Sequence, residues 1–143
     1  MKFYIAGKLE NADNVRRVRD ALVAAGHVIT YDWTVHGNVR IADDEAVTLA
    51  DVERIYDVAQ AEIDGVLDAE VVVAMLPGGR GTHVEIGIGI GAGRSIVFHC
   101  EPEHRPVLGF GQESSTFYQA RRSVKMIGSV DQLIAFLLAR YAC

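Results

Sequence analysis

The sequence is poor in cysteine: only Cys100 and Cys143 occur among its 143 residues. Two cysteines so far apart do not suggest the disulfide framework typical of small secreted domains. Long hydrophobic runs are also missing, since no stretch of 18 apolar residues occurs, and residues 1–7 have the pattern of a strand instead of a signal peptide. We therefore expect a soluble, cytoplasmic protein with no membrane partner.

Positive charge is scarce as well. Fourteen Lys and Arg face nineteen Asp and Glu, for a net charge of -5. A nucleic-acid groove needs clustered cations, so we expect no nucleic-acid partner, although small anions need only local donors. Half of the residues are hydrophobic, and the length suits one compact domain spanning residues 1–143.

Strand-like and helix-like segments alternate along the chain. The predicted strands cover residues 2–6, 27–31, 70–75, 94–98 and 123–127, and the predicted helices cover residues 11–25, 45–67 and 129–141. This alternation predicts an α/β fold with an open, mostly parallel sheet and helices on both faces. Residues 32–44 form a long polar loop, for which a functional lid and a plain surface excursion are equally good interpretations.

Residues 82–92 are ambiguous, because residues 85–91 alternate with period two, as in a strand. A strand there would leave no crossover between two parallel strands. We therefore predict a helix despite its glycines, each of which costs about 1 kcal/mol. Gly87 and Gly91 lie one turn apart, so we expect that face to approach its neighbours closely.

The glycine-rich turn before this helix is the most informative segment. It follows the buried strand of residues 71–75 and contains Gly78, Gly79 and Gly81, with Glu85 just beyond. A strand, a glycine-rich turn and a helix together build sites for phosphate or sugar in α/β proteins. The carboxyl end of a central strand is also where open α/β sheets place their ligands. Glu85 is thus a candidate catalytic carboxylate.

Glu85 also has a purely structural interpretation. Thr82 and Glu85 match the spacing of a capping box, in which Glu85 would accept from the Thr82 amide. Both interpretations stay open on sequence alone.

Glu62 is the second candidate acid. At about 100° per residue, Glu62 falls inside the apolar stripe of its helix, among Ile55, Ala59, Ile63 and Val66. Burying a carboxylate there costs free energy unless it is paired with another group or has a function. The alternative interpretation is that Glu62 lies at the boundary of the core and its side chain reaches solvent. Burial raises the pKa of a carboxyl group and suits it to proton donation. Two acids in different environments are the usual equipment for cleaving a glycosidic bond.

Other candidates carry a weaker signal. Lys8 follows the first strand and either meets an anion or is simply solvated. Asp32 and Trp33 end the second strand and either face a ligand or cover the core edge. Residues 99–104 include His and Cys, but their spacing matches no zinc pattern, so no metal is predicted.

Taken together, these motifs resemble the nucleoside 2-deoxyribosyltransferase family and its relatives that hydrolyse nucleoside 5'-monophosphates. The resemblance covers nearly the whole chain and is carried by residues 3–7 (FYIAG), 62–66 (EIDGV), 69–73 (AEVVV) and 81–87 (GTHVEIG). It implies a three-layer fold with a five-stranded parallel sheet of flavodoxin-like order 2-1-3-4-5. It also implies a homo-oligomer whose sites often borrow residues from a neighbouring subunit.

The resemblance further implies roles for residues. Glu85 would attack the anomeric carbon of the sugar, and Glu62 would take the place of an acid that is usually Asp in the family. In the hypothesised mechanism, Asp32 and Trp33 are candidate contacts to the base, and no cofactor or metal is needed. The remaining implied contacts to sugar and phosphate are Ala6, Gly7, Lys8, Gly78, Gly79, Arg80, Gly81 and Thr82.

A second resemblance concerns the same turn. Residues 77–85 fit the PGGxGTxxE signature of the cytokinin-activating phosphoribohydrolases, also called lysine-decarboxylase-like proteins, although the other glycine-rich motif of that family is missing. It implies that the loop N–H groups and Arg80 hold a 5'-phosphate.

The predicted function is therefore cleavage or transfer at the N-glycosidic bond of a (deoxy)nucleoside or its 5'-monophosphate. Whether water or a second base accepts the sugar stays open. The alternative is a non-catalytic nucleotide-binding or signalling module in which Glu85 only caps its helix.

Overall fold

A computed structural model of the chain describes residues 1–142 and shows a five-stranded parallel sheet. The strands are β1 (Lys2–Ala6), β2 (Val28–Ile29), β3 (Val71–Leu76), β4 (Ser95–Cys100) and β5 (Ser123–Ile127). Their order, β2-β1-β3-β4-β5, confirms the predicted 2-1-3-4-5 arrangement. Cys100 is buried and free, and Cys143 lies outside the described residues.

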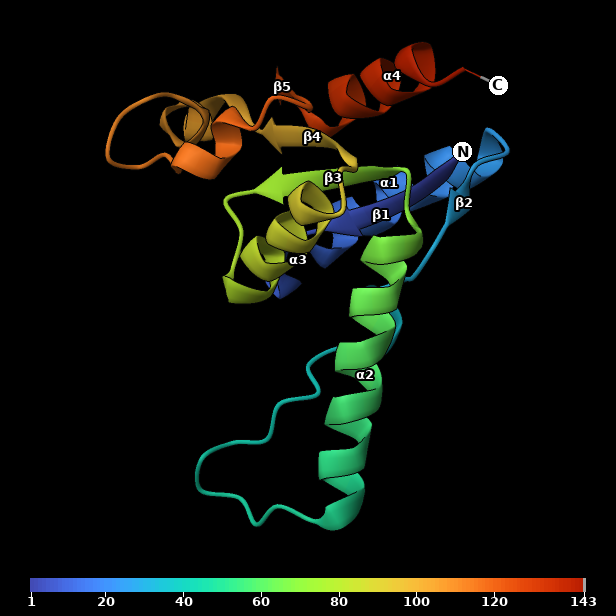
Figure 1. Cartoon of the computed structure of the whole chain (residues 1–143), viewed down its shortest axis with the longest axis vertical. Helices are drawn as coiled ribbons and strands as arrows, with labels where there is room; N and C mark the ends of the chain where they lie inside the picture. Colours follow the sequence, from blue (N-terminus) through green and yellow to red (C-terminus); the bar gives the residue numbers. More distant parts are fainter. Residues whose placement is uncertain (143) are drawn as a thin grey trace.

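Helices cover both faces of the sheet (Figure 1). The helices are α1 (Ala12–Ala24), α2 (Leu49–Asp68), α3 (Arg80–Gly91) and α4 (Val130–Arg140). Helices α1 and α4 pack together, as do α2 and α3, so each pair forms one outer layer. In the described part of the chain, no helix has the length and apolar character to cross a membrane.

Most predicted elements are confirmed, with shifted ends. The segment at 82–92 is a helix, which begins at Arg80 instead of residue 82. Helix α2 begins at Leu49 instead of residue 45, because Thr48 and Asp51 form a capping box there. The second strand is only two residues long; it lies at the sheet edge and pairs with β1 alone.

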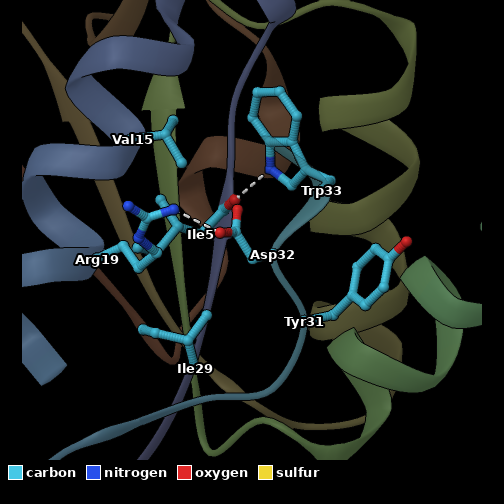
Figure 2. Close-up of a pocket in the computed structure, with 7 residues that line it drawn as sticks. All are labelled: Ile5, Val15, Arg19, Ile29, Tyr31, Asp32 and Trp33. Carbon is cyan, nitrogen blue, oxygen red and sulfur yellow. Dashed lines mark hydrogen bonds and ion pairs between the residues drawn. The ribbon is translucent and has the colours of Figure 1, made fainter. Parts of the chain in front are cut away.

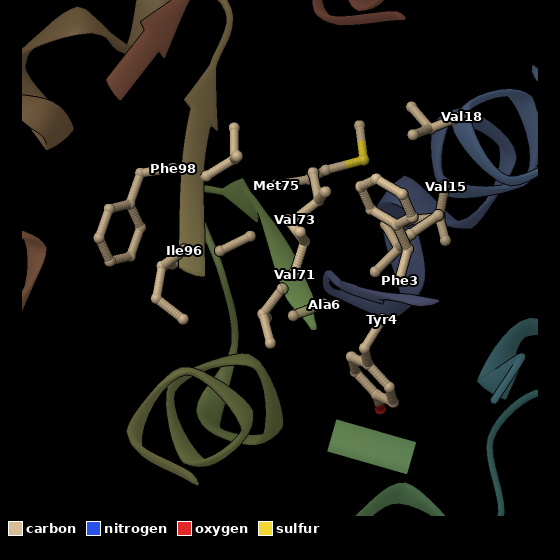
Figure 3. Close-up of a cluster of buried hydrophobic side chains, with 14 of the residues drawn as sticks. Phe3, Tyr4, Ala6, Val15, Val18, Val71, Val73, Met75, Ile96 and Phe98 are labelled. Carbon is tan, nitrogen blue, oxygen red and sulfur yellow. The ribbon is translucent and has the colours of Figure 1, made fainter. Parts of the chain in front are cut away.

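Alternating side chains of the strands fill the core on both sides of the sheet. Phe3 points toward Val15 and Val18 of α1, whereas Tyr4 points to the opposite face, toward the α2 and α3 layer (Figure 3). Every residue of β3 is buried, as expected for the central strand of a parallel sheet. Tyr4 thereby carries a hydroxyl into an otherwise apolar layer.

Helix α2 differs from the sequence prediction of a buried stripe. Only Gly65 and Val66 are buried, while Ile63 is 36% exposed and Ala59 is exposed. The reason is visible in Figure 1, where the first half of α2 extends beyond the sheet and has no layer of its own chain beneath it. Glu62 is half-buried at the point where the helix meets the sheet.

The glycines of α3 also differ from the prediction. A Cβ atom at Gly87 or Gly91 would meet nothing within 4 Å, so the expected close approach at these two positions is wrong within the described chain. Gly89 makes that approach instead, because its Cβ position lies 3.1 Å from side-chain atoms of Val72 and Ile96.

Candidate active site

The carboxyl ends of β1 and β3 lie side by side and define the site. Ala6 is paired with Ala74 in the sheet register, so the residues that follow each strand emerge together. Lys8 is the nearest neighbour of the glycine turn, since its Cβ lies 3.8 Å from the Cβ position of Gly79. The structure thus brings the predicted residues 6–8 next to the predicted residues 78–82.

The glycine turn is shaped by two close approaches. A Cβ atom on Gly78 would lie 2.6 Å from Cγ2 of Thr82, so only glycine allows the turn to fold against the first turn of α3. The Gly79 N–H donates to the Thr82 hydroxyl at 3.2 Å. Arg80 and Gly81 are exposed at the helix N-terminus. Free N–H groups at this terminus, with Lys8 and Arg80 nearby, suit an anion.

Glu85 lies one turn further along α3 and points back into the sheet. Its Oε1 accepts a 2.6 Å hydrogen bond from the phenol of Tyr4, and its residue exposure is only 7%. The helix begins after Gly79, so Thr82 is not its N-cap. The capping-box interpretation of Glu85 is therefore wrong.

The surroundings of Glu85 suit a poised carboxylate. Burial raises the pKa of Glu85, the Tyr4 hydrogen bond opposes this rise, and the charge of Glu62 adds to it. Together these effects place the pKa at about 7. Burial and the Glu85 charge together raise the pKa of Tyr4, so the phenol keeps its proton and donates it. The second oxygen of Glu85, Oε2, is buried and has no hydrogen-bond partner among residues 1–142. Glu85 thus has one oriented oxygen and one uncommitted oxygen.

Glu62 joins the site because α2 crosses the sheet very closely at Gly65. A Cβ atom on Gly65 would lie 2.6 Å from Cβ of Tyr31 and 3.2 Å from the Tyr4 ring. Glu62 is one helical turn before Gly65 and so lies on the same face. Burial raises the pKa of Glu62, and the nearby His36 opposes this shift.

Tyr31 and His36 accompany Glu62. The Tyr31 hydroxyl lies 2.9 Å from Nε2 of His36, and the two rings have centroids 5.9 Å apart. Burial raises the pKa of Tyr31, and the charge of Glu62 adds to this. His36 belongs to the loop predicted for residues 32–44, and Tyr31 directly precedes it, so this loop contributes a polar group to the site.

Asp32 and Trp33 have their polar atoms engaged within the protein (Figure 2). Asp32 Oδ2 binds Arg19 at 2.5 Å, and its Oδ1 accepts from the backbone and side chain of Thr34. The buried Trp33 ring donates its N–H to the carbonyl of Ile5 at 2.8 Å. The side chains around them close-pack and leave no cavity that admits water. These contacts give both residues a structural role, and their predicted contact with a base stays a prediction.

Several residues of the site were not singled out from the sequence. His83 lies 2.7 Å from the carbonyl of Gly79 through Nδ1 and 2.6 Å from the Tyr118 hydroxyl through Nε2. It thereby ties the glycine turn to the segment that follows β4. Of these residues, only Tyr4 could have been identified from the sequence, because a hydroxyl group in a fully buried strand needs a hydrogen-bond partner.

Within residues 1–142, no three His, Cys, Asp or Glu side chains gather closely enough to hold a metal ion.

Comparison with solved structures shows the same fold in proteins of very different sequence. The CMP N-glycosidase BcmB from Clostridium botulinum is similar with a TM-score of 0.63 and 12% sequence identity, over 99% of this chain and 100% of that one. A conserved protein from Enterococcus faecalis V583 is similar with a TM-score of 0.61 and 17% identity, over 99% of both chains. No family model matches the sequence, and no curated protein matches it.

At these identities the similarity shows the fold alone. This chain therefore shares the fold of these two proteins, and its own residues must carry the argument for function.

Proposed function

We propose that this chain cleaves the bond between the base and C1' of a nucleoside 5'-monophosphate. The observation that carries the proposal is the hydrogen bond from Tyr4 to Glu85, which orients a buried carboxylate beside Glu62. The glycine turn, Lys8 and Arg80 supply the anion site that a 5'-phosphate requires. A neighbour in fold is named as a CMP N-glycosidase, and CMP is accordingly the first substrate to test.

In the first proposed step, Oε2 of Glu85 attacks C1' as the C1'–N bond breaks. The electron pair of that bond leaves with the base, which Glu62 protonates. The product on the enzyme is a glycosyl ester of Glu85. In the second step, Glu62 takes a proton from water, the resulting nucleophile attacks C1', and Glu85 is released as a carboxylate.

The remaining residues position the substrate in this proposal. Gly79 and Arg80 hold the phosphate, and Gly7 lines the sugar. Ala6 and Thr82 are buried, so they support the strand end and the turn instead of touching the substrate as the sequence predicted. Tyr31 and His36 lie beside Glu62, on the side from which the base would leave. They are better placed than Asp32 and Trp33 to contact it.

The direct test measures base release from a panel of nucleosides and their 5'-monophosphates, with and without a free acceptor base. Release from monophosphates, lost in Glu85→Gln and retained in Asp64→Asn, is the expected result. Asp64 is an exposed acid of the same helix as Glu62 and serves as the matched control. Base exchange without net release would identify a transferase.

Binding of CMP without release from any substrate would overturn the proposal in favour of a nucleotide-binding module. Glu85→Gln activity equal to wild type would exclude the proposed nucleophile while leaving other glycosidase mechanisms open.

We also propose that the chain forms a homo-oligomer. Large apolar side chains are exposed along α2 and the segment before it: Val47 (59%), Leu49 (75%), Tyr56 (71%), Ile63 (36%) and Leu67 (43%). Apolar surface of this kind usually marks an interface. Light scattering on the eluting protein is expected to give a dimer or larger, and Leu49→Glu combined with Tyr56→Glu to give a monomer. A monomeric wild type at high concentration would refute this.

A further inference from the structure

A hollow lies at the end of the sheet opposite the glycine turn. It has a volume of about 220 Å³ and is formed where α3 ends, β4 begins and the chain approaches β5. Its apolar lining comes from Ile90, Ile96 and Ala120, and its cations are Arg94, Arg121 and Arg122. Three arginines around one small hollow are unexpected in a chain with a net charge of -5.

These arginines are not neutralised by the protein. None of the three forms an ion pair with a carboxylate of residues 1–142. Glu70 is at the same end of the sheet, but its carboxylate accepts from the Lys2 backbone N–H at 2.8 Å. Nε of Arg94 is buried without a partner in the described chain. The hollow therefore has positive charge that no carboxylate of the described chain neutralises, and an N–H donor that has no acceptor.

Two of the three guanidinium groups, those of Arg94 and Arg122, are nevertheless held in position. Arg94 donates to the carbonyl of Leu67, and Arg122 donates to the carbonyl of Gly93 at 3.2 Å. The Arg122 carbonyl is itself bound by the Ile96 N–H at 3.0 Å. Arginines that are partly ordered before a ligand arrives lose less conformational freedom on binding it.

We propose that this hollow is a binding site for a phosphate-class anion, distinct from the site at Glu85. Guanidinium groups match the geometry of phosphate oxygens and bind them through charge-assisted hydrogen bonds. A volume of about 220 Å³ has room for inorganic phosphate or for the phosphate end of a small monoester. The apolar side chains beside the arginines favour the monoester.

The test must distinguish this site from the glycine turn, which is also suited to phosphate. Amide NMR spectra of the full chain are recorded during titration with inorganic phosphate at constant ionic strength. Saturable shifts are expected at Gly93, Arg94 and Arg122, with a midpoint separate from any shifts at Gly79 and Arg80. A parallel titration with ribose 5-phosphate identifies the source: tighter binding assigns the monoester, and equal binding assigns free phosphate.

The variant Arg121→Ala/Arg122→Ala removes two exposed cations, and we expect it to weaken the response at Gly93 and Arg94 by about tenfold or more. Arg17→Ala removes an exposed arginine of α1 and is expected to leave it unchanged. Shifts at these amides that do not saturate, or that persist with unchanged affinity in the double variant, would overturn the proposal. The spectra themselves show whether each variant remains folded.

Discussion

The phenol of Tyr4 donates a 2.6 Å hydrogen bond to the carboxylate of Glu85, a residue 81 positions later in the chain. The contact joins the first strand to the third helix across the face of the sheet. Oε1 of Glu85 is held by this bond, whereas Oε2 has no hydrogen-bond partner in the described chain. That arrangement makes Glu85 a candidate nucleophile, whereas a helix cap would use its carboxylate on a backbone N–H.

Tyr4→Phe is predicted to change the pH dependence of base release. Burial and the charge of Glu62 raise the pKa of Glu85, and the Tyr4 hydrogen bond lowers it, which leaves the pKa at about 7. Without it the pKa rises further, so the carboxylate becomes ionised only at higher pH. The ascending limb of kcat/KM against pH should therefore move upward from about 7.

The control is Tyr141→Phe, because Tyr141 packs edge-on against Phe3, and Phe3 points to the face of the sheet opposite Tyr4 (Figure 3). It is expected to leave the profile unchanged. An unmoved ascending limb in Tyr4→Phe would show that Glu85 ionisation does not limit the reaction.

Glu85→Gln is predicted to stabilise the fold above neutral pH while abolishing turnover. The pKa of about 7 in the folded protein is higher than the ordinary value of 4.5 for a glutamate side chain. Between these values the unfolded chain releases a proton that the folded chain retains, so wild-type stability falls as pH rises. The full loss is about 3 kcal/mol above pH 7, and glutamine avoids it.

Urea unfolding of both proteins at pH 4.5 and pH 8 measures this difference. The two free energies of unfolding should diverge with rising pH, with the variant the more stable at pH 8. Parallel pH dependences would mean that the carboxyl group of Glu85 does not carry the raised pKa.

Gly65→Ala and Gly87→Ala are predicted to have opposite effects on stability. Both glycines are inside helices, where alanine is intrinsically favoured by about 0.5–1 kcal/mol. A Cβ at Gly87 meets nothing within 4 Å, whereas a Cβ at Gly65 lies 2.6 Å from Cβ of Tyr31. Gly87→Ala should therefore stabilise by about 0.5–1 kcal/mol, and Gly65→Ala should destabilise by about 1–3 kcal/mol.

Thermal unfolding and activity are measured on both variants. Gly65→Ala is expected to lower base release as well, because it displaces α2, and with it Glu62, from Tyr4 and Tyr31. Destabilisation by Gly87→Ala would instead indicate that this open face of α3 packs against a second copy of the chain.

Asp32→Asn is predicted to lower stability and leave substrate affinity unchanged. Burial raises the pKa of Asp32, but hydrogen bonds from Thr34 and Arg19 outweigh it and hold the pKa below its ordinary value. The ionised Asp32 carboxylate therefore stabilises the folded protein at neutral pH, and this stabilisation is lost as pH falls through the pKa of Asp32 in the folded protein. The expected cost is about 1–2 kcal/mol at pH 7.

Asp20→Asn is the matched control, since Asp20 also pairs with Arg19 but is exposed, and its cost should be below about 0.5 kcal/mol. A raised KM for CMP in Asp32→Asn, with stability unchanged, would restore the predicted role of Asp32 as a base contact.

Much of the architecture follows from local patterns in the sequence. Buried parallel strands appear as continuous apolar runs, as in residues 71–75, and helix starts appear as caps, as at Ser129. The glycine turn and Glu85 were found for the same reason, since a turn of this kind is encoded by consecutive residues. The stripe on α2 was misjudged because periodicity shows which residues share a face and not whether anything covers it.

The sequence by itself determined the order of strands and helices, the glycine turn and the candidate acids Glu85 and Glu62. Only the tertiary structure decided what these acids contact. The Tyr4 partner of Glu85 depends on the pairing of β1 with β3, and the position of Glu62 depends on the close crossing of α2 at Gly65. Both are contacts between segments distant in the chain, which are set by packing, and no local pattern of residues encodes them.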